Sequence, residues 1–167
     1  PVTSGSPATD YFISCSLFEP PQAQTHYTEC LFCTETPMFT IPRPVLPSTL
    51  LSRTELGLPE DKHIYLAPES LFKFHPDFDF LLKSILEQDP HAVIVFIRHQ
   101  FYAWHQKLAK RFENSLQNLN HRILFLEWTD QDKFFMRLLQ ADIVLDSIYF
   151  GAGTVAYQAL GLGVPIV

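Results

Sequence analysis

The feature that most constrains the fold is a regular alternation of short apolar segments and amphipathic segments, which begins at about residue 63. Each apolar segment fits a buried strand, and the segments between them carry apolar side chains at helical spacing. Apolar strands separated by helices predict a parallel sheet covered on both faces, a doubly wound, Rossmann-like α/β fold. The predicted strands are His63–Ala67, Ala92–Ile97, Arg122–Leu126 and Ala141–Asp146, and the predicted helices are Pro76–Gln88, Tyr102–Leu116 and Asp130–Leu139.

The last quarter of the chain contains a glycine-rich turn between a strand and a helix. After Asp146, residues 151–153 read Gly-Ala-Gly, and Val155–Leu162 has helical character before Gly163, where the helix is expected to end. Such a loop lets backbone N–H groups at a helix start face an anion. Two interpretations follow: a nucleotide phosphate site around Gly151–Thr154, or a tight turn that needs glycine only for steric reasons.

The first part of the chain has a different composition. It predicts a strand at Asp10–Ser14, a helix at Gln22–Glu29 and a strand at Cys30–Cys33. Residues 36–47 hold four prolines and predict an extended linker, the best candidate for a domain boundary. At the other end, Val164–Val167 predicts a further strand whose outer edge needs cover, so we expect the chain to be part of a longer protein.

Ligands of doubly wound sheets bind beyond the C-terminal ends of the strands. Lys73 lies in the first of these loops. It is interpreted either as a point charge that binds a phosphate or as a solvated surface lysine. His75, beside Pro76, is interpreted as a packing or helix-capping side chain rather than a base. Arg98 and His99 follow the second strand, either as part of a ligand rim or as the polar end of that strand.

The third loop, residues 127–130, reads Glu-Trp-Thr-Asp. A nucleobase could stack on Trp128 there, or the indole could simply cover the edge of the sheet. Thr129 is a candidate N-cap for the helix that follows. Arg137 lies on that helix, near the same rim.

Composition excludes several classes of function. Acidic side chains number 18 against 12 basic ones, and the net charge of −6 argues against nonspecific nucleic-acid binding. No apolar run reaches the roughly 18 residues of a membrane helix. The three cysteines form no disulfide framework and indicate a reducing, cytoplasmic setting, and Cys30 and Cys33 are interpreted as semi-buried strand residues. No nucleophile–base pair and no metal-ligand spacing is evident.

Several segments, in the same order, resemble the O-GlcNAc transferase/SPINDLY-like glycosyltransferases. The resemblance covers essentially the whole chain and is most specific around Lys73 and from Ala141 to Pro165. The segments that carry it are residues 1–5 (PVTSG), 10–13 (DYFI), 56–61 (LGLPED), 70–78 (SLFKFHPDF) and 141–146 (ADIVLD).

The resemblance implies a metal-independent GT-B transferase with two Rossmann-like domains and no cofactor. Residues 1–45 would then be the end of the N-terminal domain and the crossover, and residues 46–167 an incomplete C-terminal domain that binds the donor. It implies a nucleotide-sugar donor, with UDP-GlcNAc expected and UDP-glucose or GDP-fucose as alternatives. The implied acceptor is a protein Ser or Thr hydroxyl, and the catalytic residues are expected upstream of Pro1.

The resemblance also assigns roles to individual residues. Lys73 and the loop formed by Gly153, Thr154 and Val155 would hold the diphosphate. Gln158 would bind the ribose. Thr129, through its backbone, and Arg137 would lie at the base.

The chain departs from the family pattern at three of these positions. Gly153 replaces the family's histidine, Val155 its second threonine, and Gln158 its ribose-binding acid. A glutamine can still bond a ribose hydroxyl, without the strength of a carboxylate. Two such losses would weaken donor binding by on the order of tenfold to a hundredfold. Two alternatives therefore stay open: a degenerate domain that binds a nucleotide or a partner without transfer, and transfer to a glycan or lipid acceptor.

Overall fold

The computed structural model describes residues 3–98 and 101–167. They form two compact units, Pro1–Ile41 and Pro42–Val167, which are treated separately below. His99, one of the two predicted rim residues after the second strand, lies outside the described residues. The division into a domain end at 1–45 and a donor-binding domain at 46–167 stays a prediction.

The first unit is built on two parallel strands, β1 (Tyr11–Cys15) and β2 (Cys30–Thr34). Glu29, directly before β2, is buried and ties the start of the chain to this sheet. Its carboxylate accepts hydrogen bonds from the Ser4 N–H at 2.7 Å and from the Thr3 hydroxyl at 2.6 Å. These contacts fix the entry to β2 without a large apolar core.

The helix predicted at Gln22–Glu29 is wrong, because only the 3-10 helix η1 (Ala23–His26) forms. The side chain of Gln24 bonds outside the helix. Its amide donates to the Glu29 carbonyl at 2.8 Å and accepts from the Leu31 N–H at 2.9 Å. These two bonds hold the following residues in an extended path, so the helix cannot continue.

The cysteines also differ from expectation. Cys30 and Cys33 are free and exposed rather than semi-buried, whereas Cys15 on β1 is buried. A sheet of two strands leaves much of both faces open to solvent, so residues of β2 are not covered as they would be in a larger sheet.

The second unit contains a parallel sheet of four strands in the order β5-β4-β3-β6. The predicted doubly wound, Rossmann-like fold is confirmed. The strands are β3 (His63–Ala67), β4 (Ala92–Ile97), β5 (Ile123–Leu126) and β6 (Ile143–Val144).

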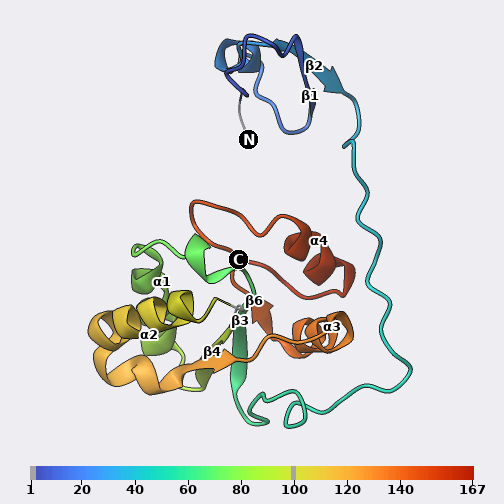
Figure 1. Cartoon of the computed structure of the whole chain (residues 1–167). Helices are drawn as coiled ribbons and strands as arrows, with labels where there is room; N and C mark the ends of the chain where they lie inside the picture. The colour runs from blue at the N-terminus through green and yellow to red at the C-terminus, as the bar shows by residue number, and fades with distance from the viewer. Residues whose placement is uncertain (1–2, 99–100) are drawn as a thin grey trace. The chain divides into compact units, whose positions relative to one another are not determined.

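Helices cover both faces of this sheet, with α1 and α2 on one side and α3 and α4 on the other (Figure 1). The α-helices are α1 (Phe78–Gln88), α2 (Tyr102–Leu116), α3 (Gln131–Gln140) and α4 (Thr154–Gly161). Two 3-10 helices, η2 (Leu71–Lys73) and η3 (Gln117–Arg122), lie before α1 and after α2. No helix of the described residues is long and apolar enough to cross a membrane.

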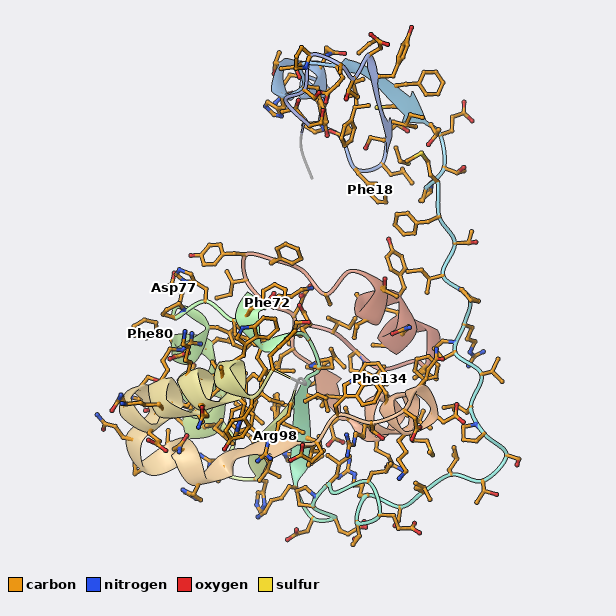
Figure 2. The ribbon with its side chains drawn as sticks, viewed as in Figure 1. Phe18, Phe72, Asp77, Phe80, Arg98 and Phe134 are labelled. Atoms are coloured by element: carbon orange, nitrogen blue, oxygen red, sulfur yellow. The ribbon has the colours of Figure 1, made fainter. Side chains whose placement is uncertain are left out.

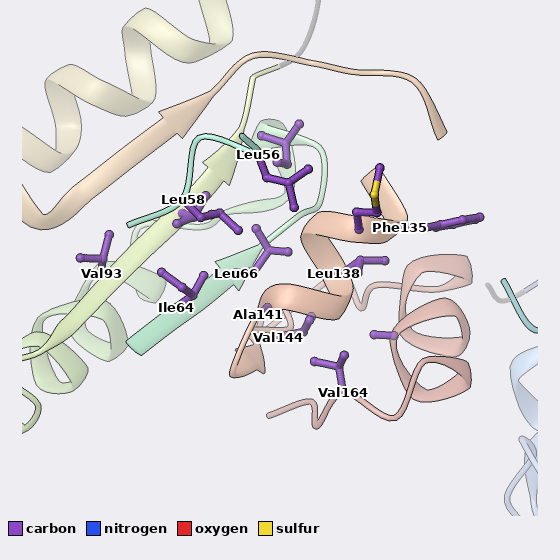
Figure 3. Packing of buried hydrophobic residues seen from close by; sticks show 14 residues of the cluster. Leu56, Leu58, Ile64, Leu66, Val93, Phe135, Leu138, Ala141, Val144 and Val164 are labelled. Carbon is purple, nitrogen blue, oxygen red and sulfur yellow. The ribbon is translucent and has the colours of Figure 1, made fainter. Parts of the chain in front are cut away.

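Alternation along the strands divides the core into two layers. On β3, Ile64 and Leu66 face α3 and α4, whereas Tyr65 and Ala67 face α1 and α2. Figure 3 shows the first layer, where Leu138 of α3 packs close to the sheet. Because both faces are buried, the strands read as continuous apolar runs, and this explains why the sequence located them well.

The last predicted strands are shorter than expected. Ala141–Asp146 contributes only Ile143–Val144 to the ladder, and Val164–Val167 contributes one parallel bridge between Val144 and Ile166. The flanking backbone still pairs, since the Leu145 N–H donates to the Leu66 carbonyl at 2.8 Å. The segment is therefore held in the sheet beside β3 although few of its residues are strand.

The start of α3 corrects another expectation. The N-cap is Asp130 rather than Thr129, because the Asp130 carboxylate accepts a hydrogen bond from the Lys133 N–H at 2.9 Å. That bond lowers the pKa of Asp130 from its usual range. Thr129 does not cap the helix and lies on the loop that follows β5.

Gly57 offers a test of packing between the segment before β3 and the end of β5. It has φ +79°, and an added Cβ would lie 3.3 Å from Cδ2 of Leu126. We expect Gly57→Ala to lower the free energy of unfolding by about 1–2 kcal/mol, through backbone strain and this contact. Urea denaturation of the full-length protein measures the change.

Gly163→Ala is the matched control, because Gly163 has φ +81° and an added Cβ there would meet nothing within 4 Å. It should lose only the backbone contribution, about 1 kcal/mol. Equal losses in the two variants would show that the contact with Leu126 adds no cost.

Candidate functional site

The order of the strands places the candidate site. The chain runs outward from β3 through β4 to β5 and then returns past β3 to β6. The chain therefore leaves β3 and β6, which are neighbours in the sheet, in opposite directions. The place where the two loops part is called the switch point, and ligands of such sheets bind in the crevice there. Lys73 lies on the first loop, and the glycine turn at 151–153 lies on the second.

The structure brings Lys73 and the glycine turn into direct contact. The Lys73 ammonium donates to the Gly151 carbonyl at 3.1 Å and lies 4.6 Å from the centre of the Phe150 ring. It also pairs with the Glu69 carboxylate at 3.1 Å, and only 15% of the lysine side chain is exposed. Lys73 is thus a held cation at the switch point and not a solvated surface lysine.

The turn itself is shaped by Asp146 and by glycine. Oδ1 of Asp146 accepts a hydrogen bond from the Ala152 N–H at 2.7 Å, which folds the loop back toward the end of β6. Gly153 then has φ +56°, a conformation that side chains disfavour, and it directly precedes α4. The positive φ at this position favours glycine over any residue with a side chain.

The start of α4 presents backbone groups rather than polar side chains. No side chain caps the helix, Thr154 is exposed, and Val155 packs against the core layer beside α3. Gln158 lies one turn further along and is half-buried. The N-terminal end of a helix carries partial positive charge, so this end and Lys73 together form a region that suits an anion.

Glu69 is a site residue that the sequence analysis did not identify. It is 3% exposed, and its Oε2 faces Lys73 and lies 3.4 Å from the Ser147 hydroxyl. Burial raises the pKa of Glu69, the neighbouring Asp146 carboxylate raises it further, and Lys73 opposes the rise. The available signal was the spacing of Glu69 and Lys73, four residues apart directly after a buried strand.

A pocket of about 390 Å³ opens beside this region, at the ends of β3, β4 and β5. Thr129 lines it, and the exposed indole of Trp128 lies on its wall. Arg98 and Phe134, both labelled in Figure 2, line it from the end of β4 and from α3. The remaining lining residues are Pro68, Glu69, Ser70, Ile97 and Gln131.

Arg98 is paired at the mouth of this pocket with Glu127, whose carboxylate accepts from its guanidinium. The two side chains come from the ends of neighbouring strands, β4 and β5. Both interpretations offered for Arg98 fit this position, since it ends a strand and also lines the pocket. The pairing offsets the positive charge that Arg98 brings to the wall of the pocket.

Arg137 does not line the pocket in this structure. It is buried on α3, where its Nε donates to the Leu56 carbonyl at 3.1 Å and its guanidinium donates to the Glu127 carbonyl at 2.7 Å. Burial lowers the pKa of Arg137 from its usual value. These bonds fix the backbone next to the pocket, and the contact of Arg137 with a base stays a prediction.

His75 is a packing residue. Its ring lies edge-on to Tyr149, with 4.9 Å between the ring centres. Tyr149 in turn donates to the Asp77 carboxylate at 2.7 Å, which raises the pKa of the tyrosine. These contacts link the start of α1 to the loop that carries Gly151, so they support the meeting of the two loops at the switch point.

No group of three or more His, Cys, Asp or Glu side chains suited to a metal ion occurs in the part of the chain that the structure describes. The polar side chains at the switch point are Lys73, Glu69, Asp146 and Ser147. In chemical terms the site offers an anion two positive groups, the Lys73 ammonium and the N-terminal end of α4, beside the carboxylates of Glu69 and Asp146.

The fold is that of a Rossmann-like α/β domain, and comparisons with known proteins agree with this fold class. No protein-family profile matches the chain. The chain is 25% identical, over its full length, to the Arabidopsis thaliana protein named probable UDP-N-acetylglucosamine–peptide N-acetylglucosaminyltransferase SEC. It spans 18% of that relative.

The same similarity appears among solved structures. A mutant of the O-GlcNAc transferase of Thermobaculum terrenum superimposes with a TM-score of 0.80 at 22% identity, over 99% of this chain and 31% of that one. At this identity the likeness is one of fold. The resemblance to the O-GlcNAc transferase group is thus confirmed as a similarity over the whole chain, and the GT-B type of architecture is consistent with it.

Proposed function

We propose that this chain is the donor-binding part of a glycosyltransferase that uses a nucleotide-diphosphate sugar. One observation carries the proposal: the Lys73 ammonium lies at the switch point of the sheet, 3.1 Å from the carbonyl of Gly151 in the loop that leads into α4. A cation and a helix start that converge on one crevice fit a diphosphate. The similarity to the plant transferase supports the same reaction class.

The roles of the residues follow from their positions. Lys73 and the backbone of Gly153, Thr154 and Val155 would hold the diphosphate, and Gln158 would reach the ribose. The base would enter the pocket lined by Thr129, Trp128 and Phe134, where an aromatic ring can stack on it. Arg137 would act on the base through the backbone that it fixes, or directly after a rearrangement.

The proposed reaction is displacement at the anomeric carbon of the sugar, with the nucleotide diphosphate as leaving group. Negative charge then develops on the β-phosphate. Once the donor is bound, Lys73 and the N-terminal end of α4 face that charge, so they stabilise it without further reorganisation during the reaction. This positive charge is the reason to propose a metal-independent reaction with no cofactor. The group that accepts the proton of the acceptor hydroxyl is proposed to lie outside this chain.

We further propose UDP-GlcNAc as donor and a protein Ser or Thr hydroxyl as acceptor, in the cytoplasm. The name of the plant relative, which includes both UDP-N-acetylglucosamine and a peptide acceptor, supports the first two parts. The cysteines support a reducing compartment, since Cys30 and Cys33 are exposed and free.

A second candidate is a domain that binds a nucleotide without sugar transfer. The start of α4 favours it, because Gly153 and Val155 contribute no polar side chain to an anion and Gln158 carries no charge. Such a domain would bind UDP weakly and release no free sugar from a donor.

Titration calorimetry of the full-length protein with UDP and with GDP tests the proposal, followed by an assay for hydrolysis and transfer from UDP-GlcNAc. Binding of UDP with measurable turnover supports the transferase. Binding without any turnover on peptide, glycan or lipid acceptors supports the second candidate. Failure to bind either nucleotide would overturn both.

A further inference from the structure

Glu69 is a buried carboxylate that the proposed donor chemistry does not use. It follows β3, and its side chain is 1% exposed. Its Oε2 contacts the Lys73 ammonium at 3.1 Å and the Ser147 hydroxyl at 3.4 Å. Its Oε1 is buried and has no hydrogen-bond partner among the described residues. A buried acceptor without a donor is costly, so this group calls for an explanation.

The charges around Glu69 come from two other segments. Lys73, on η2, is the cation that it contacts, and Asp146, just after β6, is a second carboxylate that raises the pKa of Glu69. Arg98 lines the same pocket, but its guanidinium is paired with Glu127. Of these three groups, only Lys73 is a cation available to compensate the charge of Glu69.

A diphosphate bound at this site would compete with Glu69 for the Lys73 ammonium. A diphosphate bound at the start of α4 carries its own negative charge and draws Lys73 toward it. Glu69 would then be a buried carboxylate next to Asp146, with its compensating cation shared or lost. Burial and a neighbouring negative charge both disfavour the ionised form of Glu69, so Glu69 takes up a proton instead.

We infer that Glu69 is a positioning residue that holds Lys73 in the empty site and takes up a proton from solvent when the diphosphate of the donor draws Lys73 away. The inference rests on the proposed function. The proton adds to the Glu69 carboxylate to give a neutral acid, whose O–H can donate to Asp146. No covalent bond of the donor changes in this step.

The direction of the pH dependence follows. The raised pKa of Glu69 in the empty site rises further in the complex, where Lys73 no longer opposes it. Binding is then linked to uptake of about one proton between these two pKa values. The affinity for the donor is greatest below this window and falls by up to about tenfold per pH unit as the pH rises through it.

The test is titration calorimetry of the full-length protein with UDP-GlcNAc, whose phosphates are esterified and do not titrate near neutral pH. It is run across pH 5.5–8 in two buffers of different ionisation enthalpy, so that the number of protons taken up is measured directly. The variants are Glu69→Gln, which keeps shape and hydrogen bonding, and Glu87→Gln as matched control. Glu87 pairs with Lys83 at 4.0 Å on the exposed face of α1 and has the same sequence spacing.

The wild type and Glu87→Gln should both take up a proton and bind more weakly as the pH rises. Glu69→Gln should take up none, match the wild type at acid pH, and bind about fivefold to tenfold more tightly at pH 8 because nothing competes for Lys73. If the wild type binds UDP-GlcNAc without proton uptake, the inference is wrong whether or not the variant folds. If Glu69→Gln weakens binding equally at every pH, Glu69 has only a structural role. Absence of binding by the wild type would overturn the proposed function and this inference with it.

Discussion

Replacement of Lys73 by alanine in the full-length protein is expected to lower the rate of sugar transfer by about 10²–10³-fold. Removal of one fixed charge that faces the developing charge of a leaving group typically has an effect of this size. Lys73 is suited to that role because it lies against the glycine turn, 3.1 Å from the Gly151 carbonyl, and is only 15% exposed. The loss should appear mainly in kcat, since the interaction strengthens as charge moves onto the diphosphate.

The measurement is transfer of labelled sugar at saturating donor, together with the affinity for UDP. Lys83→Ala is the matched control, because Lys83 lies on the exposed face of α1 and pairs only with Glu87 in the contacts described. The control should retain wild-type turnover. Near-normal turnover of Lys73→Ala would contradict the assignment of Lys73 to the diphosphate site. A loss of turnover in both variants would instead indicate a general effect of charge.

Replacement of Arg137 by methionine is expected to lower the free energy of unfolding by roughly 2–4 kcal/mol. Methionine fills much of the same volume but donates no hydrogen bond. The carbonyls of Leu56 and Glu127, which Arg137 reaches at 3.1 Å and 2.7 Å, would lose their donor inside the protein. Denaturation by urea, followed by circular dichroism, measures the change.

Lys133→Met is the control for this variant, because Lys133 lies exposed on the same helix. Its unfolding free energy should stay within about 0.5 kcal/mol of the wild type. Nucleotide binding separates two roles of Arg137. A structural role lowers the affinities for UDP and GDP together, whereas direct contact with the base changes their ratio. A stable Arg137→Met variant with an altered ratio would contradict the structural role described above.

The parts of the fold that the sequence predicted well are those determined by local pattern. Ala92–Ile97 is apolar at every position, and Tyr102–Leu116 is amphipathic over its full length, so both elements have the predicted bounds. The helix at Gln22–Glu29 failed because a side chain, Gln24, bonds to backbone beyond it. The N-cap of α3 failed because Thr129 and Asp130 are both good caps and only the backbone geometry selects one.

The candidate site was predictable only in part, for a related reason. Lys73 and the glycine turn were each visible as a residue type in a loop. Their contact depends on the position of β6 beside β3, which no local pattern gives. The contacts of Arg137 likewise reach back to Leu56, 81 residues earlier. Glu69 was missed because an acid near a lysine is usually solvated, and its burial is a property of the assembled sheet.

The meeting of Lys73 with Gly151 also has a consequence for biosynthesis. The two residues are 78 positions apart, so the first half of the site is synthesised well before the second. Contacts of such separation form late, because the chain must lose much of its freedom before they are made. A nascent chain that ends before β6 holds Lys73 without its glycine turn. A nucleotide sugar that binds both halves would then favour completion of the sheet, so the supply of donor would affect how much of the protein stays folded in the cell.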